Sequence, residues 1–260
     1  MRKDYVVAAE PADHETEFVE KYWTAVWEQE GGPQGQIDRI PYKDEYLAMA
    51  PYMAKLPMGA RVLDGGCGLG DWTLFFARQG FAVVGLDLSR QTVEQLKARF
   101  PEAEFVDGDI RRTNFPDSSF DAYFSWGVFE HFESGMQDCV PEAFRILKPG
   151  GQLFVSVPLD NLRHAILGTL SRPHPTAGNL RFYQWRLTRA ELARELAIGG
   201  FEVLKVSPIH KRQGVLRSLH HEFGLSYRWL FTKGLSALLA PLTPGLFIAH
   251  MELAVARKPR

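Results

Sequence analysis

A glycine-rich turn and three carboxylates are the residues best suited to chemistry in this 260-residue chain. Asp64 ends a short apolar run and leads into a turn that contains Gly66, Cys67, Gly68 and Gly70. Asp87 ends a second apolar run about 20 residues later, where an acid can accept hydrogen bonds from both ribose hydroxyls. Asp109 follows a third run. Because glycines permit close approach to the backbone and a following helix offers free amides, this pattern predicts a nucleotide-containing ligand.

The glycine spacing discriminates between two kinds of cofactor. A dinucleotide site requires the pattern G-x-G-x-x-G. In this chain Gly66 and Gly68 are followed by Gly70, one position too early for the third glycine. The spacing therefore disfavours NAD, and an NAD-type oxidoreductase is retained only as an alternative.

Short apolar runs alternate with helical patterns from residue 60 onward. We expect strands over 61–65, 82–87, 103–106, 120–125, 152–157, 201–206 and 247–256. We expect helices over 14–30, 43–56, 71–79, 89–99, 137–147 and 188–198. Such alternation predicts βαβ units and a Rossmann-like, doubly wound α/β fold with a mostly parallel sheet. In such a sheet the ligand lies outside the carboxyl ends of the strands.

These segments together resemble the class I S-adenosylmethionine-dependent methyltransferases, and in particular those that act on small molecules. The resemblance covers 60–158 well and 181–206 more loosely, and it rests on the segments 64–70, 84–89, 108–110, 125–131 and 145–151. It implies a seven-stranded sheet with an antiparallel last strand and S-adenosyl-L-methionine as cofactor. The cofactor contacts that it implies are Asp64, Gly66, Cys67, Gly68, Gly70, Asp87, Leu88, Asp109, Ile110, Ser125 and Trp126.

His131, with Glu130 beside it, is the candidate general base. Methyl transfer is an in-line displacement, and a hydroxyl or ammonium acceptor must also lose a proton, which a histidine can take near neutral pH. An alternative is that His131 caps a helix or orients a loop, while Glu130 contacts cofactor or solvent. The histidines and cysteines show no metal-ligand spacing, so we expect no metal.

The chain is expected to form one domain, with its charge divided unevenly along the sequence. Residues 1–160 hold 15 Lys and Arg against 26 Asp and Glu, whereas 161–260 hold 15 against 5. We assign 1–58 to an N-terminal helical cap, 60–158 to the cofactor-binding core, and 159–187 and 208–246 to insertions on the substrate side, the second of them a helical lid before the last strand. The aromatic candidates for substrate contact are Tyr22, Trp27, Tyr183 and Trp185.

The segment 210–247 is basic and rich in aromatic residues, which suits either a lid packed on the sheet or peripheral contact with a membrane. We expect a small-molecule, sugar-conjugate or lipid-like acceptor, with anionic acceptors among the candidates, and we do not expect nucleic acid. Pro158 is not part of the Asn/Asp-Pro-Pro-Tyr/Phe motif of nucleic-acid amino-methylating enzymes. Two cysteines and no spanning segment predict a cytoplasmic protein. A cofactor-binding regulatory or scaffold module without catalysis is the remaining alternative.

Overall fold

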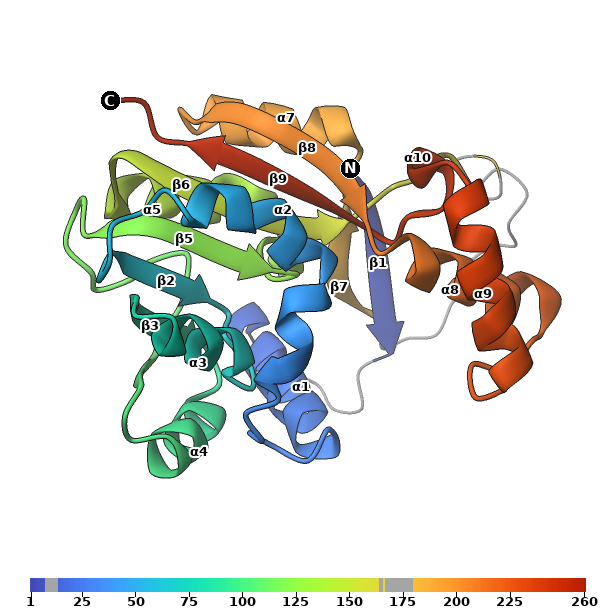
Figure 1. Cartoon of the computed structure of the whole chain (residues 1–260), viewed down its shortest axis with the longest axis horizontal. Coiled ribbons are helices and arrows are strands. Elements are labelled where there is room, and N and C mark those ends of the chain that lie inside the picture. Colours follow the sequence, from blue (N-terminus) through green and yellow to red (C-terminus); the bar gives the residue numbers. More distant parts are fainter. Residues whose placement is uncertain (8–13, 164–165, 167–179) are drawn as a thin grey trace.

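The computed structural model describes residues 1–7, 14–163, 166 and 180–260, and it contains a seven-stranded sheet (Figure 1). The strand order is β4-β3-β2-β5-β6-β9-β8. The bounds are β2 (Arg61–Gly65), β3 (Ala82–Asp87), β4 (Glu104–Asp107), β5 (Phe120–Trp126), β6 (Leu147–Pro158), β8 (Glu202–Ile209) and β9 (Met251–Arg257). Strands β2 to β6 pair in parallel, and β9 runs antiparallel to both β6 and β8. The predicted fold class, including the antiparallel last strand, is confirmed.

Helices cover both faces of this sheet because its central strands are apolar on both sides. The helices are α1 (Glu15–Gln29), α2 (Asp44–Met53), α3 (Asp71–Arg78), α4 (Arg90–Arg99), α5 (Cys139–Ile146), α7 (Arg189–Ile198), α8 (Lys211–Phe223), α9 (Leu230–Leu242) and α10 (Gly245–Ile248). Short 3-10 turns lie at η1 (Ile37–Tyr42), η2 (Phe129–His131) and η3 (Gly135–Gln137). One core packs α5 and α7 against the sheet, and a second packs α2 and α3 against the opposite face.

The strand order reverses between β2 and β5: β3 and β4 lie on one side of β2, and β5 and β6 lie on the other. At this point the crossover connections leave in opposite directions and open a crevice at the carboxyl ends of the strands. Figure 1 shows α1 below that edge of the sheet, close to the ends of β2 and β3. The fold therefore places the glycine turn, Asp87 and an N-terminal helix around one space.

Two strands that the sequence analysis did not predict form a second, small sheet. β1 (Arg2–Val7) pairs antiparallel with β7 (Leu180–Arg186), although the two are separated by most of the chain. The segment 1–58, expected as a helical cap, thus contains a strand besides its helices, and the segment 159–187, expected as an insertion, contributes the partner strand. Charged residues interrupt both segments, so their pairing is not apparent from a local pattern.

The predicted lid over 208–246 is the helical pair α8 and α9, which projects from the sheet on the right of Figure 1. The last strand starts at Met251 rather than at Phe247, because the helical turn α10 precedes it. Gly214 of α8 lies against the backbone that leaves α10: a Cβ there would be 1.8 Å from the Ile248 carbonyl oxygen. This close approach ties the helical pair to the start of β9.

Candidate cofactor and acceptor site

A cavity of about 270 Å³ lies at the carboxyl ends of β2, β3 and β5. Helix α1 forms one wall, and the glycine turn after β2 forms another. The residues that were predicted from the sequence and line this cavity are Trp27, Asp64, Gly66, Cys67, Gly68, Asp87, Leu88, Asp109, Ile110, Trp126 and His131. The structure therefore brings together residues from 27 to 131 in one concave site.

The glycine turn has a conformation that side chains would obstruct. Gly66 has φ of +80°, and a Cβ there would lie 2.4 Å from a Val128 methyl group. Gly68 has φ of +51°, and a Cβ there would lie 2.8 Å from the Trp27 ring. Glycine is needed at both positions because left-handed backbone and close neighbours each exclude larger residues.

Two buried carboxylates flank this turn. Asp64 accepts a hydrogen bond from the Thr73 hydroxyl at 2.7 Å, and burial raises its pKa to about 7. Asp87 accepts from the backbone amides of Gly68 at 2.8 Å and Ser89 at 2.9 Å, and burial also raises its pKa. Both carboxylates are held in fixed orientation at the cavity wall.

Asp109 is anchored by Arg111 rather than left free. The Arg111 guanidinium donates to both oxygens of Asp109, at 3.1 and 2.7 Å, and also to Glu15 and to the Thr16 hydroxyl. The pair of carboxylates keeps the pKa of Arg111 above its usual value, although burial of the side chain acts in the opposite direction. Arg111 thus joins the start of α1 to the loop after β4.

The face of α1 that covers the cavity is aromatic. Trp23 and Trp27 stack with ring centroids 5.1 Å apart, and Trp23 meets His131 edge-on at 5.0 Å. The indole N–H groups of Trp27 and Trp126 are buried with no hydrogen-bond partner among the described residues. Two unsatisfied donors in one cavity are consistent with a polar ligand between them, because buried donors are normally paired.

His131 and Glu130 lie in a dry part of the site at the end of β5. The Nδ1 atom of His131 is 2.7 Å from the Tyr183 carbonyl oxygen, and the Nε2 atom is 4.0 Å from a Glu130 oxygen. Burial lowers the pKa of His131 to about 4 and raises that of Glu130 to about 8. Both groups are therefore uncharged at neutral pH, and the contact with the Tyr183 carbonyl requires the imidazole proton on Nδ1. The backbone of Gly127 also interacts with this ring and, like Tyr183, opposes the effect of burial on the pKa.

The other predicted site residues do not line the cavity. Those behind or beside its walls are Tyr22, Gly70, Ser125, Glu130, Tyr183 and Trp185. Gly70 instead starts α3, and a Cβ there would be 2.5 Å from Leu96. The Ser125 hydroxyl donates to the Gly65 carbonyl, and the Trp185 indole donates to the Phe132 carbonyl.

Tyr183 contacts both His131 and Tyr22. Its ring centroid is 5.0 Å from that of His131 and 5.3 Å from that of Tyr22. Tyr183 therefore packs between Tyr22 of α1 and the candidate base His131.

Several cavity residues were absent from the predicted site. They are Val19, Glu20, Trp23, Glu30, Lys43, Leu69, Asp71, Trp72, Ser89, Gly108, Gly127, Val128 and Phe132. Trp23 could have been identified, because it lies four residues before Trp27 and therefore on the same helix face. Val128 and Phe132 come from the loop after β5, whose path no local pattern reveals.

Within the described ranges, no group of three or more His, Cys, Asp or Glu side chains is arranged to hold a metal ion. In the same part of the chain, no helix has both the length and the apolar character needed to cross a membrane.

Comparisons with known proteins identify the family. Residues 62–151 match a family model described as a methyltransferase domain. An uncharacterized methyltransferase of Synechocystis is 31% identical over 179 residues, covering 67% of this chain and 77% of the relative. The 2-methyl-6-phytyl-1,4-hydroquinone methyltransferase of the same organism is 35% identical over 133 residues, 48% of this chain and 42% of the relative.

A solved structure supports the fold over nearly the whole chain. A methyltransferase in complex with the Trm112 activator of Haloferax volcanii has a TM-score of 0.65 at 21% identity, covering 93% of this chain and 98% of that one. The chain spans about half the length of several curated relatives that it matches. The family match, the relatives and the shared fold show that the chain belongs to the class I S-adenosylmethionine-dependent methyltransferases.

Proposed function

We propose that the chain transfers a methyl group from S-adenosyl-L-methionine to a small, lipid-like acceptor in the cavity under α1. The observation that carries this proposal is that the glycine turn, the Asp87 carboxylate and the neutral His131 imidazole all line one cavity. A cavity that opens beside a backbone turn and two buried carboxylates suits a ligand with ribose hydroxyls and an ammonium group. The unpaired indole donors of Trp27 and Trp126 fit a ligand rich in acceptors.

The residues have distinct roles in this proposal. Asp87 would hold the ribose hydroxyls, and Asp64 with the glycine-turn backbone would hold the amino acid end. Ile110 and the loop at Asp109 would hold the adenine. Because Arg111 already occupies both oxygens of Asp109, we assign Asp109 to positioning this loop as well as to contact with the base.

When bound, S-adenosylmethionine supplies a methyl group on a sulfonium leaving group. The protein then has to align the acceptor, exclude water and remove one proton. Alignment alone contributes as much as about 7–11 kcal/mol in ideal intramolecular cases. His131 would accept the acceptor proton at Nε2, since its Nδ1 proton is held by the Tyr183 carbonyl. Trp23 and Trp27 exclude water from the same space.

The surface of α9 supports a lipid-like acceptor and peripheral membrane contact. This helix buries the small residues Thr232, Ser236 and Ala240, and it exposes large apolar ones. The exposed fractions are 84% for Leu230, 69% for Phe231, 67% for Leu238 and 77% for Leu242. A helix in water normally shows the opposite pattern, and large exposed apolar patches mark interaction sites.

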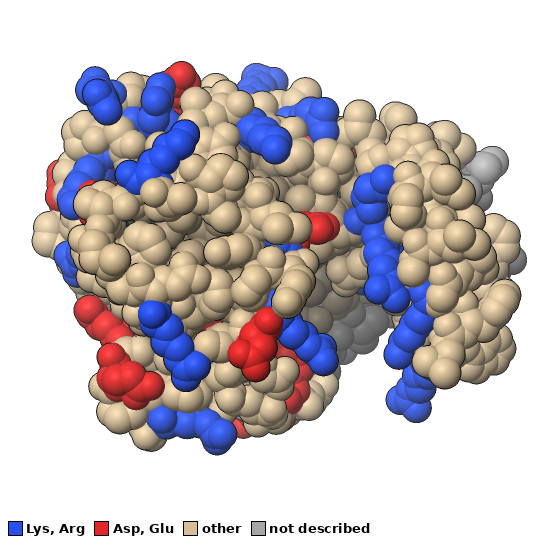
Figure 2. Space-filling model, viewed as in Figure 1, with Lys and Arg blue, Asp and Glu red and all other residues tan. Residues whose placement is uncertain are grey.

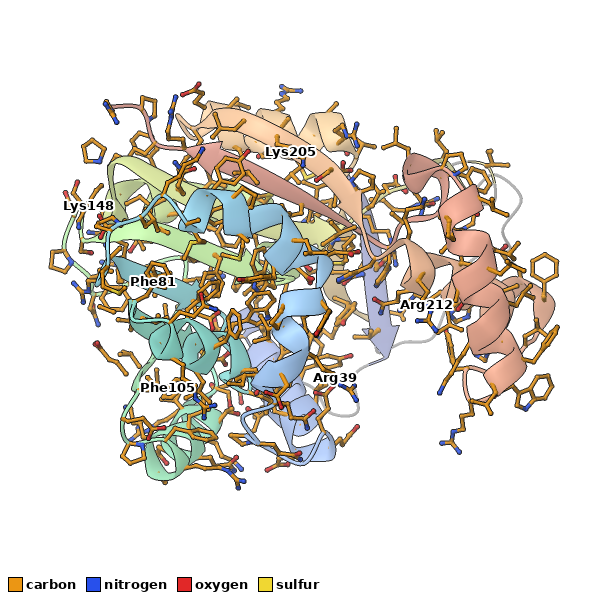
Figure 3. All side chains as sticks on the ribbon, in the orientation of Figure 1. Arg39, Phe81, Phe105, Lys148, Lys205 and Arg212 are labelled. Carbon is orange, nitrogen blue, oxygen red and sulfur yellow. The ribbon has the colours of Figure 1, made fainter. Side chains whose placement is uncertain are left out.

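Charge on the same unit fits an anionic lipid surface. Figure 2 shows Lys and Arg along the edge of the α8–α9 unit that faces the sheet, while most of its remaining visible surface is uncharged. Arg212 lies on this edge (Figure 3). Apolar side chains flanked by basic ones are typical of segments that lie in the membrane interface.

A co-sedimentation experiment tests the membrane contact. We expect the chain to bind vesicles that contain anionic lipid and the double variant Phe231→Ser/Leu238→Ser to lose that binding. Leu47→Ser is the control, because Leu47 is 61% exposed on α2, away from this surface. Equal binding by the double variant and the wild type would refute the contact.

A transfer assay tests the activity. The purified chain is incubated with methyl-labelled S-adenosylmethionine and fractions of polar and lipid small molecules, and label is followed into new products. We expect label in an organic-soluble or amphiphilic product, with none from the His131→Ala variant. If the chain binds the cofactor but labels no fraction, the regulatory-module alternative is correct instead.

A further inference from the structure

A second cavity, outside the cofactor site, is lined by basic side chains. It measures about 260 Å³ and lies between α8, the end of β7 and the segments that follow β6 and precede β9. We call it the basic pocket and define it by Arg163, Arg186, Arg217, His221 and His250. Among the described residues that line it, none is an aspartate or a glutamate.

The acids nearest to this pocket neutralise only part of its charge. Arg186 pairs with Asp4 at 2.7 Å, and Arg163 pairs with Glu222. Arg217 forms no salt bridge with any residue in the described part of the chain. Among the described residues, three guanidinium groups of the pocket therefore face two paired carboxylates.

The cationic surroundings of the basic pocket affect the pKa of His221. Burial lowers the pKa of this imidazole first, and the nearby charges of Arg217, His220 and Arg163 lower it further, against the opposing charge of Glu222. A neighbouring anion would reverse the effect of those cations.

Tyr183 interacts with a residue of each site, His131 of the cofactor cavity and Arg217 of the basic pocket. The Tyr183 ring packs on His131 at 5.0 Å, and burial raises its pKa. The charge of Glu130 raises that pKa further, whereas that of Arg217 lowers it. One aromatic side chain therefore contacts the candidate base and is close enough to Arg217 for that charge to act on it.

We propose that the basic pocket binds an anionic oxygen group of the acceptor, a phosphate or a carboxylate, and so holds the acceptor for reaction beside His131. Planar guanidinium groups match both oxyanions through paired hydrogen bonds. The role of the pocket in holding the acceptor rests on the proposed methyl transfer. The pocket itself shares no lining residue with the cofactor cavity. The acceptor is then an amphiphile with its anionic head in the basic pocket.

Direct binding of small anions tests the pocket. The full chain is titrated with inorganic phosphate and, in a second series, with acetate. Chloride keeps the ionic strength constant in both series, and the ring signals of His221 are followed by NMR. We expect one or both anions to bind and to raise the pKa of His221. The Arg217→Ala variant should bind at least about tenfold more weakly, since hydrogen bonds to charged groups contribute about 1.5–3 kcal/mol each.

Arg212→Ala is the matched control, because it removes the same charge from the same helix at a residue outside the basic pocket. Preference for phosphate identifies a phosphorylated acceptor, and preference for acetate a carboxylate. If neither phosphate nor acetate binds more tightly than chloride, the inference is wrong. It is also wrong if Arg212→Ala weakens anion binding as much as Arg217→Ala does. Titration of the same samples with S-adenosylhomocysteine separates this failure from a failure of the cofactor site.

Discussion

Glu130 should make the stability of the protein fall as the solution is made alkaline. The residue is 1% exposed, one of its side-chain oxygens has no partner among the described residues, and burial raises its pKa to about 8. Because the folded state holds the proton more tightly than the unfolded state, Glu130 contributes stability that is complete below pH 4.5 and is lost progressively up to pH 8.

The size of this effect follows from the pKa difference. Between pH 6.5 and 8.5 the unfolded carboxyl is already ionised, while the folded one loses its proton near pH 8. At about 1.4 kcal/mol per pH unit, the loss across this window is about 2 kcal/mol. The substitution Glu130→Gln keeps the shape of the neutral side chain and removes the titration.

Urea denaturation at pH 6.5 and 8.5 measures the effect. We expect the free energy of unfolding of the wild type to fall by about 2 kcal/mol more than that of Glu130→Gln. Glu133→Gln is the control, because Glu133 lies three residues away with a side chain that is 60% exposed. The same pH dependence in wild type and Glu130→Gln would refute a buried, neutral Glu130.

Three further predictions concern the walls of the cavity. Gly68→Ala places a Cβ 2.8 Å from Trp27 at a φ of +51°. Calorimetry should therefore show that this variant binds S-adenosylhomocysteine at least about tenfold more weakly than the wild type. Unchanged affinity would contradict the close approach of the backbone at Gly68 to its neighbours. A lysine at 111 cannot bridge Asp109 and α1 as the Arg111 guanidinium does. We therefore expect backbone amides of residues 15–29 to exchange faster with solvent in Arg111→Lys than in the wild type. Equal exchange rates in the two proteins would show that the bridge is not needed to hold α1. His131→Gln should lower kcat by about 10²-fold or more at similar cofactor affinity, and a wild-type rate would exclude His131 as the base.

The part of the cavity that we assign to the cofactor was predictable because its residues follow one local rule. Asp64, Asp87 and Asp109 each come after an apolar strand, and parallel strands end at the same edge of the sheet. The glycine at 68 signals close approach by its type alone. These features can be recognised in the sequence because the strand, the turn and the helix follow one another along the chain.

The acceptor half depends on contacts between distant segments. The β1–β7 ribbon joins residues separated by most of the chain, and it places Tyr183 against His131. The basic pocket combines Arg186 of β7, Arg217 of α8 and Arg163 from the segment after β6. The excess of positive charge after residue 160 is compatible with an anionic acceptor, but it does not indicate that three guanidinium groups meet in one cavity.

The most direct test of the central claim is calorimetric titration with S-adenosylhomocysteine of the wild type, Asp87→Ala and Asp107→Ala, with NAD as the control ligand. Asp107 pairs in register with Asp87 on the neighbouring strand, but it is exposed and lies outside the cavity. We predict micromolar binding by wild type and Asp107→Ala, loss of binding by a folded Asp87→Ala, and no binding of NAD. A folded wild-type chain that does not bind S-adenosylhomocysteine, or that binds it equally well without the Asp87 carboxylate, would contradict the assignment of this cavity to the cofactor.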